Sequence, residues 1–111
     1  MEPRLKAEIW VKAHIRRCWS AEVPAMVVRR GDETAGTVLL KLNRLDGSCI
    51  VLAPARQPDG SRMWLQATGP EPVPEADGDA YIARELRRDP DLWVIEIEDR
   101  AGRHFLDEPV V

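Results

Sequence analysis

The amino-acid sequence predicts an α+β fold, in which an N-terminal helix covers one face of a mainly antiparallel sheet of four to five strands. Apolar residues recur at helical spacing over residues 3–20, and short runs rich in Val, Ile and Leu follow over residues 26–68. Apolar and acidic residues then alternate over residues 92–98. These patterns predict a single domain, residues 1–111, with the element order α-β-β-β-β-α-β.

The composition is typical of a soluble globular protein. Of the 111 residues, 44% are hydrophobic and 32% are charged, and the net charge of −3 does not favour nucleic acid as the main partner. Two cysteines and the absence of an uninterrupted apolar N-terminal run predict reduced thiols and a cytoplasmic location. Because no apolar stretch approaches the ~18 residues of a membrane-spanning helix, we expect no membrane association.

Residues 3–20 are predicted to form the N-terminal helix. Pro3 suits the first helical position, and Arg16 and Arg17 suit the C-terminal end of the helix dipole. Two apolar stripes run along it, which together are wider than one sheet-facing stripe needs: Ala7, Val11, Ile15, Cys18 and Trp19, then Leu5, Ile9 and Ala13 with Trp10 beyond. Its basic side consists of Arg4, Lys6, Lys12, Arg16 and Arg17. A solvated face is the usual explanation of such a side, and a nucleic-acid contact is the alternative.

Residues 26–53 predict a three-strand antiparallel meander, with strands at 26–30, 37–44 and 49–53. If Asp46-Gly47 forms a two-residue turn, Leu42 lies opposite Val51 and Leu40 opposite Ala53. If the loop between Gly31 and Gly36 closes evenly, Val27 lies opposite Leu40. One face then carries Val27, Val38, Leu40, Leu42, Cys49, Val51 and Ala53, and the other carries Met26, Val28, Leu39, Lys41, Asn43, Ile50 and Leu52. Both faces are apolar in the middle, so each needs a cover.

The remaining elements are a strand at 62–68, a short helix at 79–88 and a strand at 92–98. Between the first two, residues 69–79 hold three prolines and two glycines and predict an irregular crossing. Asp89-Pro90 ends the helix. In the last strand Trp93, Ile95 and Ile97 point inward and Glu96 and Glu98 outward. All four tryptophans, Trp10, Trp19, Trp64 and Trp93, are expected at core or interface positions.

Three separated motifs resemble a family of short alphaproteobacterial cytosolic proteins known only as a domain of unknown function. The motifs are Arg29-Arg30-Gly31-Asp32 with Ala35-Gly36, then residues 43–47 (Asn-Arg-Leu-Asp-Gly), then residues 89–100 from Asp89-Pro90 to Arg100. The resemblance covers nearly the whole chain, except that residues 69–79 match no part of the pattern. It implies no activity, cofactor or partner, so it assigns no residue a role.

Two clusters are candidate chemical sites. The set His14, Cys18, Cys49 and His104 is the one conceivable Cys2His2 group, but it lacks the closely spaced pair that zinc sites show, so no metal or cofactor is expected. A polar surface site is predicted from Arg29, Lys41, Glu96, Glu98, Asp99 and Arg100. Carboxylates on one strand can perform acid–base or metal-dependent hydrolysis, although a cross-strand ladder of ion pairs has the same pattern.

The loop between Gly31 and Gly36 also raises the question of a phosphate site. Asp32 and Glu33 lie in this loop and would repel phosphate. The loop also joins a strand to a strand, whereas a phosphate-binding loop leads into a helix. The sequence therefore favours a plain turn.

The sequence favours a small non-enzymatic cytosolic binding or adaptor protein, because it holds excess apolar surface and no catalytic constellation. The alternatives are a small enzyme or metal-dependent hydrolase using Glu96, Glu98 and Asp99, and a nucleic-acid-binding protein using the basic side of the first helix. A homodimer, or a contact with another protein, is the expected partner arrangement, with Trp10, Met26, Val28 and Leu39 as the interface residues. Alternatively, residues 105–111 fold back and seal the second apolar face.

Overall fold

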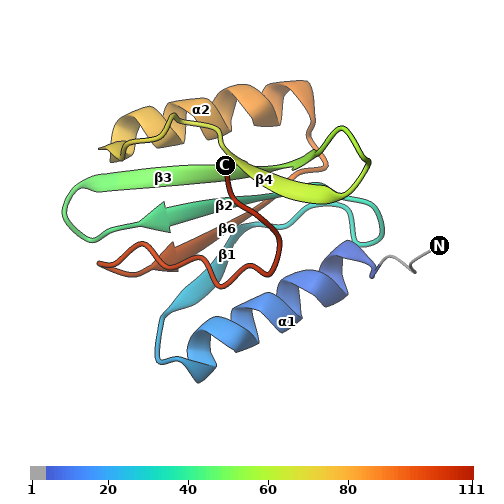
Figure 1. Cartoon of the computed structure of the whole chain (residues 1–111), viewed down its shortest axis with the longest axis horizontal. Helices are drawn as coiled ribbons and strands as arrows, with labels where there is room; N and C mark the ends of the chain where they lie inside the picture. The colour runs from blue at the N-terminus through green and yellow to red at the C-terminus, as the bar shows by residue number, and fades with distance from the viewer. Residues whose placement is uncertain (1–4) are drawn as a thin grey trace.

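A computed structural model of the chain describes residues 5–111 and contains, within them, two helices and six strands (Figure 1). In chain order these are α1 (Ala7–Ser20), β1 (Ala25–Arg29), β2 (Val38–Asn43), β3 (Ser48–Arg56), β4 (Arg62–Gln66), β5 (Val73–Pro74), α2 (Glu75–Arg88) and β6 (Trp93–Glu98). The predicted α+β class and element order are confirmed, and the very short β5 is the strand that the sequence did not predict. The predicted helix start at Pro3, and Arg4 of the basic side, lie outside the described residues.

The sheet has the strand order β1-β6-β2-β3-β4, and β5 pairs with β3. All neighbouring strands are antiparallel except β2 and β6, which run parallel. The predicted hairpin between the first two strands is therefore wrong, because β6 lies between them. Val27 pairs with Ile95 of β6, not with Leu40.

The loop between β1 and β2 crosses over the start of β6, and its two glycines permit that crossing. A Cβ atom on Gly31 would overlap the carbonyl oxygen of Asp91, and one on Gly36 would lie 2.8 Å from the same oxygen. The indole Nε1 of Trp93 donates a hydrogen bond to the Asp32 carbonyl (2.7 Å), which fastens the loop to β6. These glycines are needed for close approach and not for a tight turn.

The turn between β2 and β3 also differs from the prediction. It spans four residues, Arg44–Gly47, instead of Asp46-Gly47 alone, with Leu45 at φ 62° and Gly47 at φ 88°. The register shifts by one residue in consequence: Leu42 pairs with Ile50, and Leu40 with Leu52. Since a one-residue shift exchanges the two faces, the face predicted to hold Cys49, Val51 and Ala53 holds Ile50 and Leu52 instead.

The sheet separates two hydrophobic layers, with α1 below it and α2 above it in Figure 1. The larger layer packs the sheet against α1, whose buried residues are Ala7, Val11, His14 and Cys18. Trp93, Ile95 and Ile97 point into this layer, as predicted, and are at most 1% exposed. The smaller layer buries Leu39, Val51 and Val94 beneath α2.

Helix α2 begins four residues earlier than predicted, at Glu75 after Pro74. Proline at the helix boundary fits, because the first helical N–H groups have no carbonyl partner within the helix. The earlier start adds a turn of helix over β3, where a Cβ atom on buried Gly78 would overlap the Cys49 sulfur. The second apolar face is thereby covered by the chain's own helix.

Residues 105–111 do fold back, but onto the α1 side of the sheet (Figure 1). Phe105, Leu106 and Val110 pack against the larger layer. Val110 forms a parallel bridge with Trp64 of β4, and the Trp64 amide donates to the Pro109 carbonyl (2.8 Å). This segment therefore pairs with the β4 edge of the sheet.

Candidate functional site

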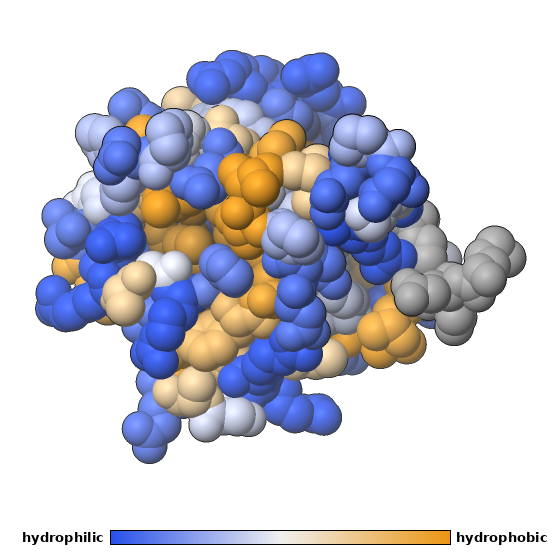
Figure 2. Space-filling model, in the orientation of Figure 1, coloured by the Kyte–Doolittle hydropathy of each residue, from blue (hydrophilic) through white to orange (hydrophobic). Residues whose placement is uncertain are grey.

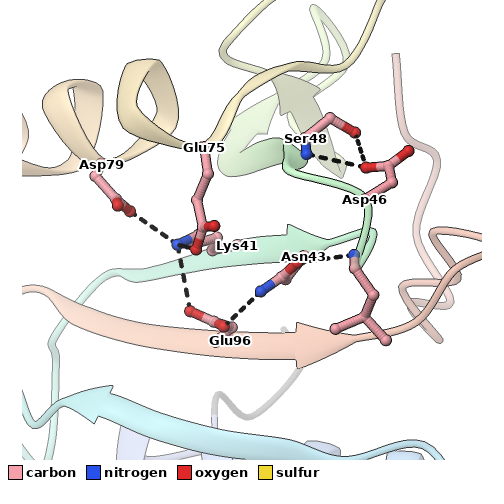
Figure 3. A network of polar contacts seen from close by, with 8 residues as sticks. Lys41, Asn43, Asp46, Ser48, Glu75, Asp79 and Glu96 are labelled. Carbon is pink, nitrogen blue, oxygen red and sulfur yellow. Dashed lines mark hydrogen bonds and ion pairs between the residues drawn. The ribbon is translucent and has the colours of Figure 1, made fainter.

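Lys41 is at the centre of a polar cluster between β2, β6 and α2 (Figure 3). Its Nζ lies 2.7 Å from a carboxylate oxygen of Glu75, 2.8 Å from Asp79 and 3.4 Å from Glu96. Asn43 donates a further hydrogen bond to Glu96 (3.1 Å). The first two carboxylates come from the first turns of α2 and the third from β6, so one ammonium group joins the helix to the sheet.

The surroundings of Lys41 keep it charged. Burial favours the neutral amine, but hydrogen bonds to Asp79 and Glu75 and the charge of Glu96 outweigh it, so the pKa of Lys41 is raised. The side chain is 6% exposed, and a charged amine held in this way has no free electron pair for nucleophilic attack. The arrangement fits an ionic clamp that fixes α2 on the sheet.

The other residues of the predicted polar surface site do not join this cluster. The Asp99 carboxylate binds Arg103 (2.9 Å from Nε), and this interaction lowers the Asp99 pKa. Arg29 donates to the Arg30 carbonyl (3.5 Å). Glu98 is half-buried and Arg100 is exposed beyond the end of β6. Lys41 and Glu96 are thus the two predicted residues that the structure brings together, and Glu75, Asp79 and Asn43 complete their cluster.

The Cys2His2 set does not form one group. Cys18 lies in the layer under α1 and Cys49 beneath α2, so the sheet separates the two free, buried thiols. His14 Nε2 donates to the His104 backbone carbonyl (2.8 Å), and the His104 ring nitrogen Nδ1 accepts from the Leu106 amide (2.9 Å). Within residues 5–111, no group of three or more His, Cys, Asp or Glu side chains has metal-binding geometry.

The outer edge of β1 carries an exposed apolar surface. We call it the edge surface and define it as Trp19, Met26, Val27 and Val28, which are between 37% and 58% exposed. Two of the predicted interface residues, Met26 and Val28, belong to it. Leu39 is buried under α2, and Trp10 is partly buried against the larger layer, stacked on His14 and Trp64.

A groove of about 750 Å³ lies between α1, the β3–β4 hairpin and residues 107–108. Its aromatic wall is formed by Trp10 and Trp64, with ring centroids 5.8 Å apart. Sequence reasoning did not find this groove. Its residues come from five separate segments, and the signal within the sequence was the second apolar stripe of the first helix, which contains Leu5 and Ala13 and lies beside Trp10.

The basic side of α1 is divided among several contacts. Lys12 pairs with Glu8 (3.0 Å), and Arg17 pairs with Asp107 (3.2 Å). Lys6 lines the groove, while Arg16 is exposed. The basic residues therefore do not act as one continuous surface.

Comparison with known proteins shows relatives that match over nearly the whole of both chains. The chain is 47% identical to a DUF1491 family protein from Caulobacter crescentus CB15 whose crystal structure is known, with a TM-score of 0.87 over 97% of this chain and 100% of that one. An NMR structure of a DUF1491 family protein from the same organism is 46% identical, with a TM-score of 0.84 and 99% of each chain covered. The solution structure of protein Atu0922 from A. tumefaciens is 31% identical, with a TM-score of 0.75 over 96% and 97% of the two chains.

No protein with a curated description matches the chain. In the part of the chain that the structure describes, neither helix has the length and apolar character needed to cross a membrane. The family model described as "Protein of unknown function (DUF1491)" matches residues 5–107. With that match and these relatives, the chain belongs to the DUF1491 family, as its three motifs had indicated.

Proposed function

We propose that this protein is a small non-enzymatic binding protein of the cytoplasm, which acts through protein–protein contact at its edge surface. The observation that carries the proposal is an edge strand with three consecutive exposed apolar residues, Met26, Val27 and Val28. Natural edge strands are usually protected by charge or proline, because an unprotected edge pairs readily with another strand. The two free thiols, buried in separate layers, are in keeping with a reducing compartment.

The backbone of β1 leaves hydrogen-bonding groups for a partner. The Glu98 amide donates to the Pro24 carbonyl (2.9 Å), so in the antiparallel pattern Met26 also faces β6. The backbone groups of Ala25 and Val27 therefore face away from the sheet. The Ala25 carbonyl accepts from the Trp19 indole (2.9 Å), which leaves Val27 as the centre of the open edge.

We propose a second copy of the chain as the partner. Antiparallel pairing of two β1 strands about Val27 obeys two-fold symmetry, and it places the same apolar residues of both copies together. The indole of Trp19, which is 55% exposed, would gain a cover from the partner in this arrangement. The pairing would extend one sheet into a continuous sheet across the dimer.

Sedimentation equilibrium at micromolar concentration tests the proposal. A homodimer gives a concentration-dependent mass that approaches twice the 12.6 kDa of the chain. Val28→Glu should return the mass to that of the monomer, because it places two like charges in the contact. Leu65→Glu is the matched control, since Leu65 is a comparably exposed apolar residue on β4 at the opposite edge.

A constant mass of one chain across the concentration range would rule out the dimer. Equal dissociation by Val28→Glu and Leu65→Glu would place the contact elsewhere. Circular dichroism spectra of both variants establish that each keeps its fold before the masses are compared.

A further inference from the structure

The groove between α1 and the β3–β4 hairpin has the size and lining of a binding site. Its volume of about 750 Å³ is within the range of ligand-binding clefts. Ala13, Ala55 and Trp10 supply apolar lining beside the charged side chains. Figure 2 shows one face of the molecule, on which hydrophobic residues gather towards the middle and hydrophilic residues surround them. The edge surface is not part of this groove.

The charge of the groove is opposite to that of the whole protein. Four basic residues line it, namely Lys6, Arg17, Arg56 and Arg62, against the two acidic residues Asp107 and Glu108. Both acidic residues already have partners: Asp107 pairs with Arg17 (3.2 Å), and Glu108 accepts from the Trp64 indole (3.1 Å). The chain as a whole carries a net charge of −3, so this basic excess is local.

The chain's own segment 105–111 shows which kind of ligand this surface accepts. Its sequence is apolar and acidic, Phe-Leu-Asp-Glu-Pro-Val-Val, and it runs along one end of the groove. Arg17 donates to the Phe105 carbonyl (2.8 Å) as well as pairing with Asp107. The Trp64 amide binds the Pro109 carbonyl, and Val110 packs on the core. The carboxylates of this segment therefore bind cationic or indole donors, its backbone hydrogen-bonds to β4, and its apolar side chains pack on an apolar surface.

We propose that the open part of the groove binds an extended acidic peptide segment of a partner protein. Lys6 and Arg62, which are both exposed, hold its carboxylates as Arg17 holds Asp107. Its apolar side chains lie against Trp10 and Ala55. This site does not include the edge surface at β1, so the proposal of peptide binding does not depend on the proposed dimer.

The probe is a synthetic peptide with the sequence of residues 105–111, compared with a peptide in which its Asp and Glu are replaced by Asn and Gln. Titrated into the isotope-labelled protein, the acidic peptide should shift the indole N–H signal of Trp10. The indole N–H signals of Trp19 and Trp93 should not shift, because these groups donate to the Ala25 and Asp32 carbonyls, away from the groove. The neutral peptide should bind at least about tenfold more weakly, which corresponds to the loss of about 1.4 kcal/mol.

A matched pair of variants tests the basic rim. Lys6→Glu with Arg62→Glu should weaken binding of the acidic peptide by about tenfold or more. Arg84→Glu with Arg87→Glu makes the same change in net charge on exposed positions of α2, on the far face of the sheet, and should leave affinity within about twofold. The peptide comparison uses the unmodified protein, so it decides the question even if a variant fails to fold.

Three results would overturn the proposal. The first is equal affinity for the acidic and neutral peptides. The second is an equal loss of affinity in both double variants, which would indicate attraction by net charge alone. The third is a shift of the Val111 amide signal with no change at Trp10. Because the Val111 amide donates to the Trp64 carbonyl, that shift would mean that the peptide replaces the chain's own segment instead of filling the groove.

Discussion

At the scale of single residues, Lys41 shows how a surface pattern becomes an internal clamp. The sequence grouped it with Glu96 and Glu98, and a cross-strand ladder of ion pairs was the plainer explanation of that pattern. The structure keeps the Lys41–Glu96 contact but covers it with α2, whose Glu75 and Asp79 complete the coordination of the ammonium group. A buried cation of this kind is held by its partners, and its removal leaves carboxylates without compensation.

Lys41→Met should therefore destabilise the fold by about 3 kcal/mol, the lower end of the range for a broken buried ion pair, because two of the three carboxylates are partly exposed. Urea unfolding at neutral pH measures this difference. Lys12→Met is the control: Lys12 also pairs with a glutamate, but it is 70% exposed, so its loss should cost less than about 1 kcal/mol. Equal effects of the two substitutions would contradict the clamp.

The pH dependence of Lys41 has a defined sign. Since folding raises the pKa of Lys41, its contribution to stability is complete below its ordinary value of 10.5 and is lost as the pH rises through the higher folded-state value. The free energy difference between the parent protein and Lys41→Met should then shrink in strongly alkaline solution. A difference that stays constant there would mean that the charge of Lys41 contributes nothing.

His14 should give the protein an acid-side pH dependence. Burial lowers the pKa of His14 despite its hydrogen bond to the His104 carbonyl, so the unfolded chain binds a proton more readily than the folded one. The contribution of His14 to stability is therefore complete at pH values above its ordinary pKa of 6.5. It is lost as the pH drops through the lower pKa of the folded state. In His14→Gln, which keeps an N–H donor without a titrating ring, urea midpoints between pH 7 and 5 should change less steeply. If the pH dependence of the midpoint is the same in His14→Gln as in the parent protein, groups other than His14 cause it.

At the scale of elements, local patterns predicted the helices and strands better than their pairing. The alternation of Trp93, Ile95 and Ile97 was sufficient to place β6 and its inward face. Its position between β1 and β2 was not predictable, because Gly31 and Gly36 have the pattern of a hairpin loop while they serve a close crossing over Asp91. The predicted register between β2 and β3 was wrong for a similar reason. Asp46-Gly47 has the composition of a two-residue turn, and Leu45 at positive φ extends the turn to four.

The packing of α2 on β3 depends on the absence of a side chain at Gly78. Alanine is the better helix former by about 1 kcal/mol, yet its methyl group would meet the Cys49 sulfur. We expect Gly78→Ala to destabilise the protein by about 2 kcal/mol through overpacking. Thermal and urea unfolding give the value.

A double-mutant cycle separates this clash from a general intolerance of α2 to change. In a Cys49→Ala background the sulfur is gone, and the nearest remaining atoms to the added methyl are Val51 Cγ2 at 3.4 Å and the Cβ of residue 49 at 4.0 Å, both ordinary van der Waals distances. Gly78→Ala should there be neutral or stabilising by up to about 1 kcal/mol. A destabilisation of the same size in both backgrounds would contradict the close contact.

At the scale of the whole molecule, the two proposed binding surfaces lie towards opposite edges of the sheet, the edge surface at β1 and the groove beside β4. Met26 and Val28 of the edge surface were predictable, because successive apolar residues on a strand cannot all face one core. The groove was not, because Trp10, Arg62 and Glu108 lie far apart in the sequence and meet only when segment 105–111 folds onto β4. In the strand order β1-β6-β2-β3-β4, the edge surface lies on β1, whereas the groove is lined by residues of β2, β3 and β4, so that β6 lies between the two.

This separation predicts that the two proposed contacts are independent. Val28→Glu should abolish self-association and leave the affinity for the acidic peptide within about twofold, because distant sites without shared partners are additive to within about 0.5 kcal/mol. Lys6→Glu with Arg62→Glu should weaken peptide binding and leave the sedimentation mass unchanged. The measurement is sedimentation with and without saturating peptide, together with peptide titration of each variant. If peptide binding dissociates the dimer, or if Val28→Glu weakens peptide binding tenfold, the two surfaces are coupled through the sheet and the additive description is wrong.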